Sequence, residues 1–241
     1  MLSKNQIKFI TSLQQKKYRF QNRLFIAEGV KVVNELINSS LELEKLYCTE
    51  DNGLSLGNFE PEIITEKELL KISGLSTPNK VLGLFKIPSV PKIKMEGLIL
   101  ALDDINDPGN LGTIIRLCDW FGVQSLVCSK NTVDCFNPKV VQATMGSLSK
   151  VLISYVDLDE FLRETSLPIY GATMDGETIS LVSLEKNAIL IMGNESHGLS
   201  NEIELLVTKK ITIPKFTKSK DIDSLNVATA TAIILNEFRR T

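Results

Sequence analysis

Three loops of this 241-residue chain carry polar side chains directly after an apolar run, where a strand is expected to end. The first loop, 103–110, follows the run 98–102 and leads into a helical pattern that carries Arg116. The second loop covers 193–199, and the third covers 214–226. In α/β proteins, ligands bind beside the carboxyl ends of strands. These loops are therefore where binding and polar chemistry are expected.

Each loop alone also fits an ordinary turn, because Asn110, Ser200 and Ser224 are residue types that cap helices. Three such loops at one edge of a sheet favour a shared site over three unrelated turns.

The common phosphate-binding and metal-binding patterns are missing. Only Gly109-x-x-Gly112 follows the first expected strand, whereas a dinucleotide fingerprint needs GxGxxG. Residues 193–198 have the glycine spacing of a phosphate loop, but Leu-Ser follows where Lys-Ser/Thr is required. The single histidine, His197, has no partner at zinc-ligand spacing, so no metal is expected. A lone histidine in a glycine-rich loop is more often a loop residue than a catalytic base.

A regular alternation of strands and helices predicts a carboxyl-terminal domain over 97–241. Strands are expected at 97–102, 125–129, 151–155, 168–173, 188–193 and 210–213. Helices are expected at 110–121, 138–145, 158–165, 200–206 and 225–239. This order predicts the α/β class, with a mostly parallel sheet and helices on both faces.

Residues 1–88 are expected to form a smaller α/β domain, with a proline-containing linker at 89–96. A helix is expected to open at 25–29 and to continue through Ile37. Short strands are expected near 45–49, 63–64 and 81–85, and a helix at 69–72.

The first 24 residues are basic, with no acid before Glu28. The cations are Lys4, Lys8, Lys16, Lys17, Arg19 and Arg23. One interpretation is a solvated helix face; the other is a surface that contacts nucleic-acid phosphates.

The overall composition is that of a globular protein, 43% hydrophobic and 23% charged. A formal net charge of −2 supplies no global field toward nucleic acid or membrane, although a local patch can act alone. Four cysteines without a CxxC pair favour a reducing, cytoplasmic setting. The start does not resemble a signal peptide, and no apolar run approaches the roughly 18 residues of a membrane span.

Three motifs in order resemble those of the SpoU (TrmH-like) family of RNA ribose 2′-O-methyltransferases, within the knotted SPOUT class. They are DINDPGNLGTIIR at 104–116, IMGNESHGL at 191–199, and ITIP followed by SLNVA at 211–228. Residues 137–141 and 144–147 resemble the family's connecting segment, and 1–86 resemble its substrate-binding domain. The resemblance covers nearly the whole chain.

The resemblance implies S-adenosylmethionine as the cofactor, bound in a bent shape within a deep carboxyl-terminal trefoil knot. It places cofactor contacts at Thr173, Met192, Gly193, Ile213, Ser224 and Leu225. Gly193 has no side chain to block a ligand, and Ile213 and Leu225 would contact the adenine.

The same resemblance places the catalytic group at Asn110, Arg116, Glu195, Ser224 and Asn226. A ribose 2′-hydroxyl must lose its proton as it attacks the methyl group, and no metal is needed. Arg116 either accepts that proton or, because arginine stays protonated, clamps a phosphate and stabilises the alkoxide. Asn110 and Glu195 are expected to orient Arg116, and Ser224 to position the nucleotide.

The resemblance implies two partners. One is RNA, with ribosomal RNA favoured over transfer RNA, and the other is a second copy of the chain in a homodimer. Lys139 joins the six basic residues above as an expected RNA contact. Two features depart from the family: Gln142 stands where arginine is common, and the loop 214–224 is about three residues longer. Its lysines are either a substrate-reading element or a solvated insertion. The competing function is a non-catalytic RNA-binding or ribosome-assembly protein with the same fold.

Overall fold

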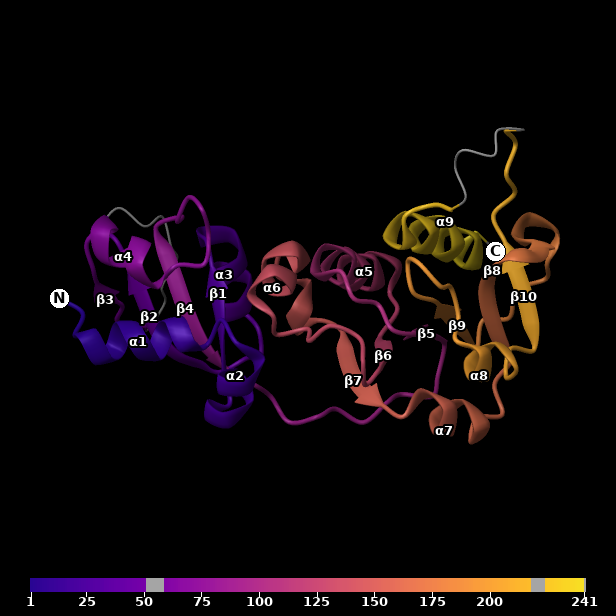
Figure 1. Cartoon of the computed structure of the whole chain (residues 1–241), viewed down its shortest axis with the longest axis horizontal. Helices are drawn as coiled ribbons and strands as arrows, with labels where there is room; N and C mark the ends of the chain where they lie inside the picture. Colours follow the sequence, from indigo (N-terminus) through magenta and orange to yellow (C-terminus); the bar gives the residue numbers. More distant parts are fainter. Residues whose placement is uncertain (51–58, 218–223, 241) are drawn as a thin grey trace. The chain divides into compact units, whose positions relative to one another are not determined.

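The computed structural model describes residues 1–50, 59–217 and 224–240, which fall into two compact units (Figure 1). The first unit combines Met1–Ser89 with Asp134–Ser149. The second combines Val90–Val133 with Lys150–Thr241. The first unit thus contains the expected amino-terminal domain together with a segment that follows it much later in the chain. The boundaries at 88 and 97 stay a prediction.

The first unit is built on a four-stranded sheet in the order β1-β4-β2-β3. The strands are β1 (Leu24–Glu28), β2 (Leu43–Cys48), β3 (Glu62–Ile63) and β4 (Val81–Lys86). Strand β4 pairs antiparallel with β1 and β2, and β2 pairs parallel with β3. The helices are α1 (Lys4–Ser12), α2 (Lys16–Asn22), α3 (Val30–Ile37), α4 (Glu66–Ile72), α6 (Pro138–Thr144) and the short 3-10 turn η1 (Ser147–Ser149).

The prediction that a helix opens at residues 25–29 is wrong. These residues belong to β1, all of whose residues are buried, and α3 begins only at Val30. A short apolar run has no periodicity that separates a buried strand from a buried helix. Gly29 ends the strand with a φ of 85°, a conformation that glycine adopts without strain.

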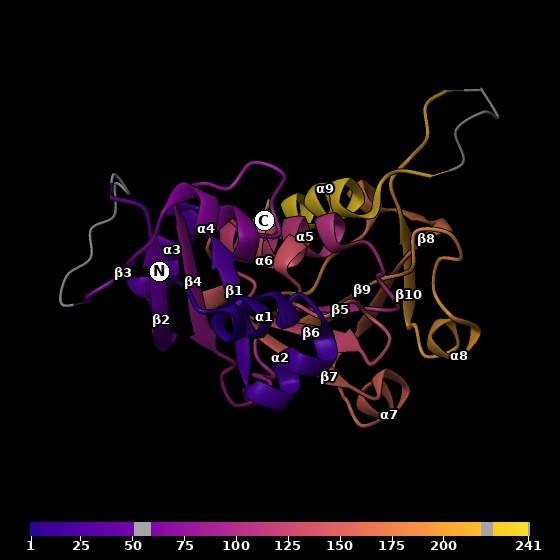
Figure 2. The ribbon, with the colours of Figure 1, turned by 60° about the vertical axis from the view of Figure 1, so that its left-hand side comes forward.

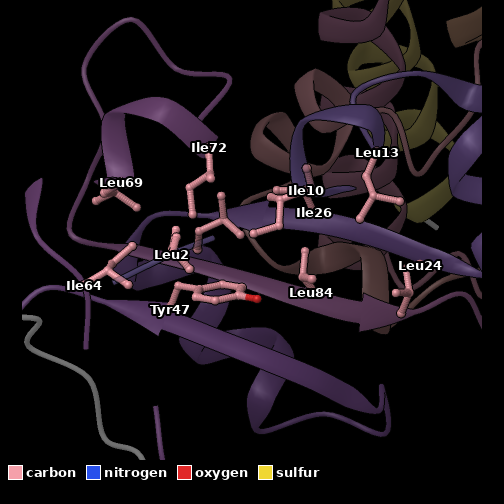
Figure 3. Packing of buried hydrophobic residues seen from close by; sticks show 11 residues of the cluster. Leu2, Ile10, Leu13, Leu24, Ile26, Tyr47, Ile64, Leu69, Ile72 and Leu84 are labelled. Atoms are coloured by element: carbon pink, nitrogen blue, oxygen red, sulfur yellow. The ribbon is translucent and has the colours of Figure 1, made fainter. Parts of the chain in front are cut away.

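The core of the first unit forms between its sheet and the amino-terminal helices (Figure 3). Ile10 and Leu13 from the first helical segment pack with Ile26 of β1 and Leu84 of β4. The remaining buried members of this cluster are Leu2, Leu24, Tyr47, Ile64, Leu69, Ile72 and Leu82. Ile7 packs partly buried against the same cluster, whereas Lys4 and Lys8 of α1 are exposed to solvent.

The second unit is built on a six-stranded sheet in the order β10-β8-β9-β5-β6-β7 (Figure 2). Every neighbouring pair of strands is parallel. The strands are β5 (Leu98–Leu102), β6 (Ser125–Ser129), β7 (Leu152–Val156), β8 (Ile169–Thr178), β9 (Ala188–Met192) and β10 (Lys209–Thr212). Five of the six match the expected bounds within one residue, and β8 continues five residues past its expected end. Strands β5 and β9 are buried along their whole length, and such parallel strands read as continuous apolar runs.

Helices cover both faces of this sheet, as expected for the α/β class. They are α5 (Pro108–Phe121), the 3-10 turn η2 (Ile179–Leu181), α7 (Leu158–Arg163), α8 (Asn201–Glu204) and α9 (Val227–Arg239). In Figure 1, α5 and α9 lie on the opposite side of the strands from α7 and α8. One apolar cluster joins Leu158 and Leu162 of α7 and Ile203 of α8 to residues of β5, β6 and β9.

Helices α5 and α9 lie side by side and run in the same direction. At their amino-terminal ends, Asn226 of the α9 cap contacts Asn110 of α5. At their carboxyl-terminal ends, Arg239 donates from Nε to the Phe121 carbonyl at 2.7 Å and from Nη2 to the Gly122 carbonyl at 3.2 Å. A cation at the end of a helix satisfies free carbonyls and complements the helix dipole. Both helix starts are thereby held at one edge of the sheet.

Within the described ranges, no helix has both the length and the apolarity that a membrane span requires. The same residues contain no cluster of three or more histidine, cysteine or acidic side chains placed to hold a metal ion.

Candidate active site

The first loop leaves the Asn110 side chain available for contacts with other loops. Asp107 caps α5, because its Oδ1 accepts a hydrogen bond from the Asn110 N–H at 2.8 Å. Pro108 occupies the first turn, where its missing N–H costs nothing. The alternative interpretation of Asn110 as the helix cap is therefore wrong.

The side chains of Asn110, Glu195 and Asn226 form one hydrogen-bonded chain that joins the three loops. Asn110 Nδ2 donates to Glu195 Oε1 at 2.9 Å. Asn226 Nδ2 donates to Asn110 Oδ1 at 2.8 Å. Glu195 and Asn226 lie 85 and 116 positions after Asn110 in the sequence, so the fold and not chain proximity brings the three together.

Asn226 also caps α9. Its Oδ1 accepts from the N–H groups of Ala228 at 3.0 Å and Thr229 at 3.2 Å. Ser224, expected as a cap, lies two residues too early and is exposed. Ser200 does stand at the cap position of α8, but its side chain makes no capping hydrogen bond. Asn226 thus combines a structural role with its place in the polar chain.

Two residues that the sequence reading did not select hold the second loop in shape. Asn194 Oδ1 accepts from the N–H groups of Ser196 and His197, and its Nδ2 donates to the Asp104 carbonyl at 2.7 Å. The buried Asp103 accepts from the Ser200 N–H at 2.7 Å. The available signal was a polar residue within two positions of the end of a buried strand, because such residues fix the turn that follows.

Gly193 is required by the chain itself. A Cβ at this position would lie 2.3 Å from the Gly198 carbonyl carbon and 2.4 Å from the Leu199 nitrogen. The loop closes on itself here through backbone hydrogen bonds between Asn194 and Gly198 in both directions, at 2.9 and 3.0 Å. The glycine therefore permits the loop to fold back, a reason different from the ligand approach that was expected.

Arg116 is exposed on α5 and has no hydrogen bond to Asn110 or Glu195 in the described part of the chain. The expectation that these two residues orient Arg116 is not met in this structure. Six helical residues rotate a side chain by roughly 240° and advance it about 9 Å, so residues 110 and 116 face different directions. Trp120, one turn further along, is 84% exposed.

Apart from Thr173, the residues expected to hold the cofactor lie at the ends of β9 and β10 and just before α9. Met192 is buried at the end of β9, Gly193 follows it, and Ile213 is half-buried after β10. Leu225 is 49% exposed, which leaves an apolar side chain available beside the polar chain. Ser224 lies next to it and is exposed.

Thr173, in the middle of β8, presents a buried hydroxyl that lacks a hydrogen bond of good geometry among the described residues. The pKa of the neighbouring Asp175 carboxyl is lowered, first by its hydrogen bond with Lys210 and then by its interaction with Thr173. A buried polar atom without a partner is costly unless a bound molecule or water satisfies it. The residues present therefore fit a polar ligand here.

The basic residues expected to contact RNA divide into exposed and buried ones. Those exposed are Lys4, Lys8, Lys16, Lys17, Arg23 and Lys139. Arg19 is instead 1% exposed, and its Nη2 lies 2.6 Å from Asp134 Oδ2. Its Nη1 donates to the carbonyls of Leu13 and Gln14 at 3.0 and 2.9 Å. The expected RNA contact at Arg19 is therefore wrong, because its guanidinium donors are already hydrogen-bonded inside the first unit.

Comparison with known proteins shows the family to which this fold belongs. The model of the SpoU rRNA Methylase family matches residues 97–236, and the MRM3-like substrate binding domain matches 4–83. The chain is 27% identical to "23S rRNA (guanosine(2553)-2'-O)-methyltransferase RlmP" of Bacillus subtilis, over 98% of this chain and 97% of that protein.

Two solved structures share the whole fold. A putative RNA methyltransferase of the TrmH family from Porphyromonas gingivalis is 37% identical, with a TM-score of 0.88 and full coverage of both chains. An AdoMet-bound rRNA methyltransferase from Sinorhizobium meliloti is 30% identical, with a TM-score of 0.85, over 100% of this chain and 96% of the other. The family model covers more than half of the residues and the three motifs lie within it, so this chain belongs to the SpoU rRNA methylase family.

Proposed function

We propose that this protein transfers a methyl group from S-adenosylmethionine to a ribose 2′-hydroxyl of ribosomal RNA. The observation that carries the proposal is the hydrogen-bonded chain from Glu195 through Asn110 to Asn226, which unites the three family motifs. The Bacillus subtilis relative is named for this activity on 23S rRNA, and the Sinorhizobium meliloti relative binds AdoMet.

When bound, S-adenosylmethionine supplies a methyl group already activated by its sulfonium. Leu225 and Ile213 provide apolar surface for the adenine, and the buried Thr173 hydroxyl offers a hydrogen bond to a polar group. The closed loop after Gly193 presents a rigid edge of backbone. A rigid site holds the reacting atoms nearly in line, so little free energy is lost to reorganisation during the reaction.

Arg116 acts on the RNA side of the reaction. Its exposed guanidinium, with no acidic partner among the described residues, is available for a phosphate, which arginine binds in bidentate geometry. Since arginine remains protonated, it stabilises the developing alkoxide rather than accepting the proton. Glu195, held by Asn110 in the polar chain, is the carboxylate of the motif set that would accept or relay that proton.

The protein is also proposed to act as a homodimer and to carry the family's trefoil knot. Trp120 supports the dimer, because an 84% exposed tryptophan one helical turn from Arg116 is an unusual solvent-facing residue. Ile233 of α9 adds a further exposed apolar side chain. Trp120 is the single tryptophan of the chain, so its fluorescence reports association directly. A blue shift with rising concentration, matched by a dimer mass in sedimentation equilibrium, is expected.

The test is transfer of tritiated methyl groups to ribosomal RNA from a strain that lacks this gene. The expected product is a ribose-methylated nucleoside, identified after complete digestion. Arg116→Ala is expected to lose about 10²- to 10³-fold in kcat, in line with removal of one charge-stabilising group, while S-adenosylmethionine binding by calorimetry stays unchanged. RNA binding without transfer to any RNA fraction would instead identify a non-catalytic binding protein, and a base-methylated product would overturn the ribose assignment.

A further inference from the structure

Helices α1 and α2 of the first unit present positive charge without any neighbouring acid in their own sequence. No aspartate or glutamate precedes Glu28. With Arg19 buried, the exposed cations of this segment are Lys4, Lys8, Lys16, Lys17 and Arg23. The protein as a whole carries a formal charge of −2, so this local excess is not a reflection of composition. A polyanion is the partner that such a surface complements.

Aromatic rings lie among these lysines on α2. Phe20 is 46% exposed, and the Lys16 ammonium lies 5.9 Å from the centre of its ring. The Lys17 ammonium lies 5.9 Å from the centre of the half-buried Tyr18 ring. In each pair the ammonium lies over the ring, so a cation and a flat aromatic surface stand side by side. A nucleotide has the matching parts, a flat base and a phosphate.

Helix α2 is held rigidly from its inner side. Arg19 points inward and is anchored by Asp134, at 3.1 Å from Nε and 2.6 Å from Nη2. The same guanidinium donates to the carbonyls of Leu13 and Gln14, in the connection between α1 and α2, so the two helices are fixed to each other. The outward side chains of α2, Lys16, Lys17 and Phe20, are therefore presented on a fixed support. A fixed support lowers the entropy lost when a flexible strand binds.

We propose that α2 is a stacking platform for unpaired nucleotides of the RNA substrate, with bases on Phe20 and Tyr18 and phosphates on Lys16 and Lys17. The proposal rests on the proposed function for the identity of the RNA. It adds which structural state of that RNA the first unit selects. Base faces are accessible only in single strands, loops and bulges, so a paired helix cannot use these rings.

The test compares two fluorescein-labelled probes, a twelve-nucleotide oligouridylate and a twelve-base-pair RNA duplex, by anisotropy titration of the full chain. Phe20→Leu keeps an apolar side chain against the protein but removes the aromatic face. It is expected to lose roughly tenfold in affinity for oligouridylate, within the range for one stacked base, and to bind the duplex as wild type does. Phe20→Trp is expected to retain or strengthen binding. Leu70→Ala, which trims a 61% exposed apolar residue on α4, is the matched control.

The lysines have a separate signature. Removing two phosphate contacts with Lys16→Ala and Lys17→Ala is expected to reduce the slope of log affinity against log salt by about 1.4 for single-stranded RNA. Phe20→Leu is expected to leave that slope unchanged, because stacking releases no counterions. Equal oligouridylate affinity in Phe20→Leu and wild type would overturn the proposal, as would an equal loss on both probes.

Methyl-transfer kinetics separate this proposal from the proposed function. With ribosomal RNA as substrate, Phe20→Leu is expected to raise KM without lowering kcat. If wild type transfers methyl groups and Phe20→Leu has an unchanged KM, the platform is excluded and the activity stands. If wild type transfers none, the activity is excluded, and the oligouridylate titration still decides the platform.

Discussion

The side-chain amide of Asn226 donates to the Asn110 Oδ1 at 2.8 Å. Because the Oδ1 of Asn226 also caps α9, this contact ties the start of α9 to the start of α5. The two functions of Asn226 use different atoms, Nδ2 for Asn110 and Oδ1 for the helix. They can therefore be separated by substitution.

Asn226→Asp keeps a capping oxygen but removes the amide donor, whereas Asn226→Ala removes both. Asn226→Ala is expected to cost about 1 kcal/mol for the cap and about 1 kcal/mol for the lost hydrogen bond. Asn226→Asp is expected to retain most of the stability and still lose methyl transfer, because Asn110 is no longer fixed toward Glu195. Urea denaturation and the tritium assay measure the two effects. Full activity in Asn226→Asp would show that the contact with Asn110 does not matter for catalysis.

The ion pair of Arg19 with Asp134 is expected to be a main contributor to the stability of the first unit. Arg19→Ala leaves a carboxylate that is 5% exposed without its partner, which is expected to destabilise by about 3–5 kcal/mol. Lys16→Ala on the exposed side of the same helix is the control and is expected to change stability by less than about 0.5 kcal/mol. The measurement is the free energy of unfolding in urea.

An apolar replacement of the whole pair sharpens that test. Arg19→Met combined with Asp134→Leu is expected to be more stable than Arg19→Ala, since no buried charge is left unpaired. A double variant as unstable as the sum of its single variants would contradict this account.

Gly193→Ala is expected to disturb the second loop. The new Cβ would meet the Gly198 and Leu199 backbone at 2.3 and 2.4 Å, so the closed loop must open or shift. Overpacking of this kind costs about 1–3 kcal/mol, and calorimetric titration is expected to show weaker binding of S-adenosylmethionine. Ser196→Ala, at an exposed position of the same loop, is the control. Unchanged cofactor affinity in Gly193→Ala would argue that the loop lies apart from the cofactor.

Glu68 makes stability depend on acid pH. Hydrogen bonds from the Thr65 N–H, the Leu2 N–H and the Thr65 hydroxyl lower the pKa of Glu68 from 4.5 to about 2. A carboxyl whose pKa is lowered by folding stabilises the protein above its ordinary value, and this contribution is lost as pH falls from about 4.5 toward 2. The midpoint of thermal unfolding is expected to fall less over this interval in Glu68→Gln than in wild type. Glu66→Gln, at an exposed position of the same helix, is expected to behave like wild type.

The sequence predicted the second unit well because its strands are continuous apolar runs, as in 98–102 and 188–192, separated by amphipathic helices. The family expectation built on the three motifs is confirmed by the family model over 97–236. The meeting of Asn110 with Glu195 followed from one rule, that parallel strands end at one edge of the sheet.

Two failures have a common physical cause, a partner far away in the sequence. Arg19 reads as a solvated or phosphate-binding cation because its acidic partner, Asp134, lies 115 residues later. The strand at 24–28 reads as the start of a helix because its pairing strand, β4, begins more than fifty positions further on. The different directions of Asn110 and Arg116, by contrast, follow from helical geometry alone, because six residues do not complete a whole number of turns.

The first compact unit is assembled from two stretches of chain, so the polypeptide passes between the units three times, near residues 89, 133 and 149. Phe136 of the later stretch packs against Phe25 of β1 with ring centres 5.0 Å apart, and Val140 and Val141 of α6 are fully buried. A fusion or recombination event at residue 89 would therefore not transfer a complete substrate-binding module, because part of its interior is encoded within the methyltransferase half. Modular exchange in proteins of this build requires the segment 134–149 to travel with the amino-terminal residues that it covers.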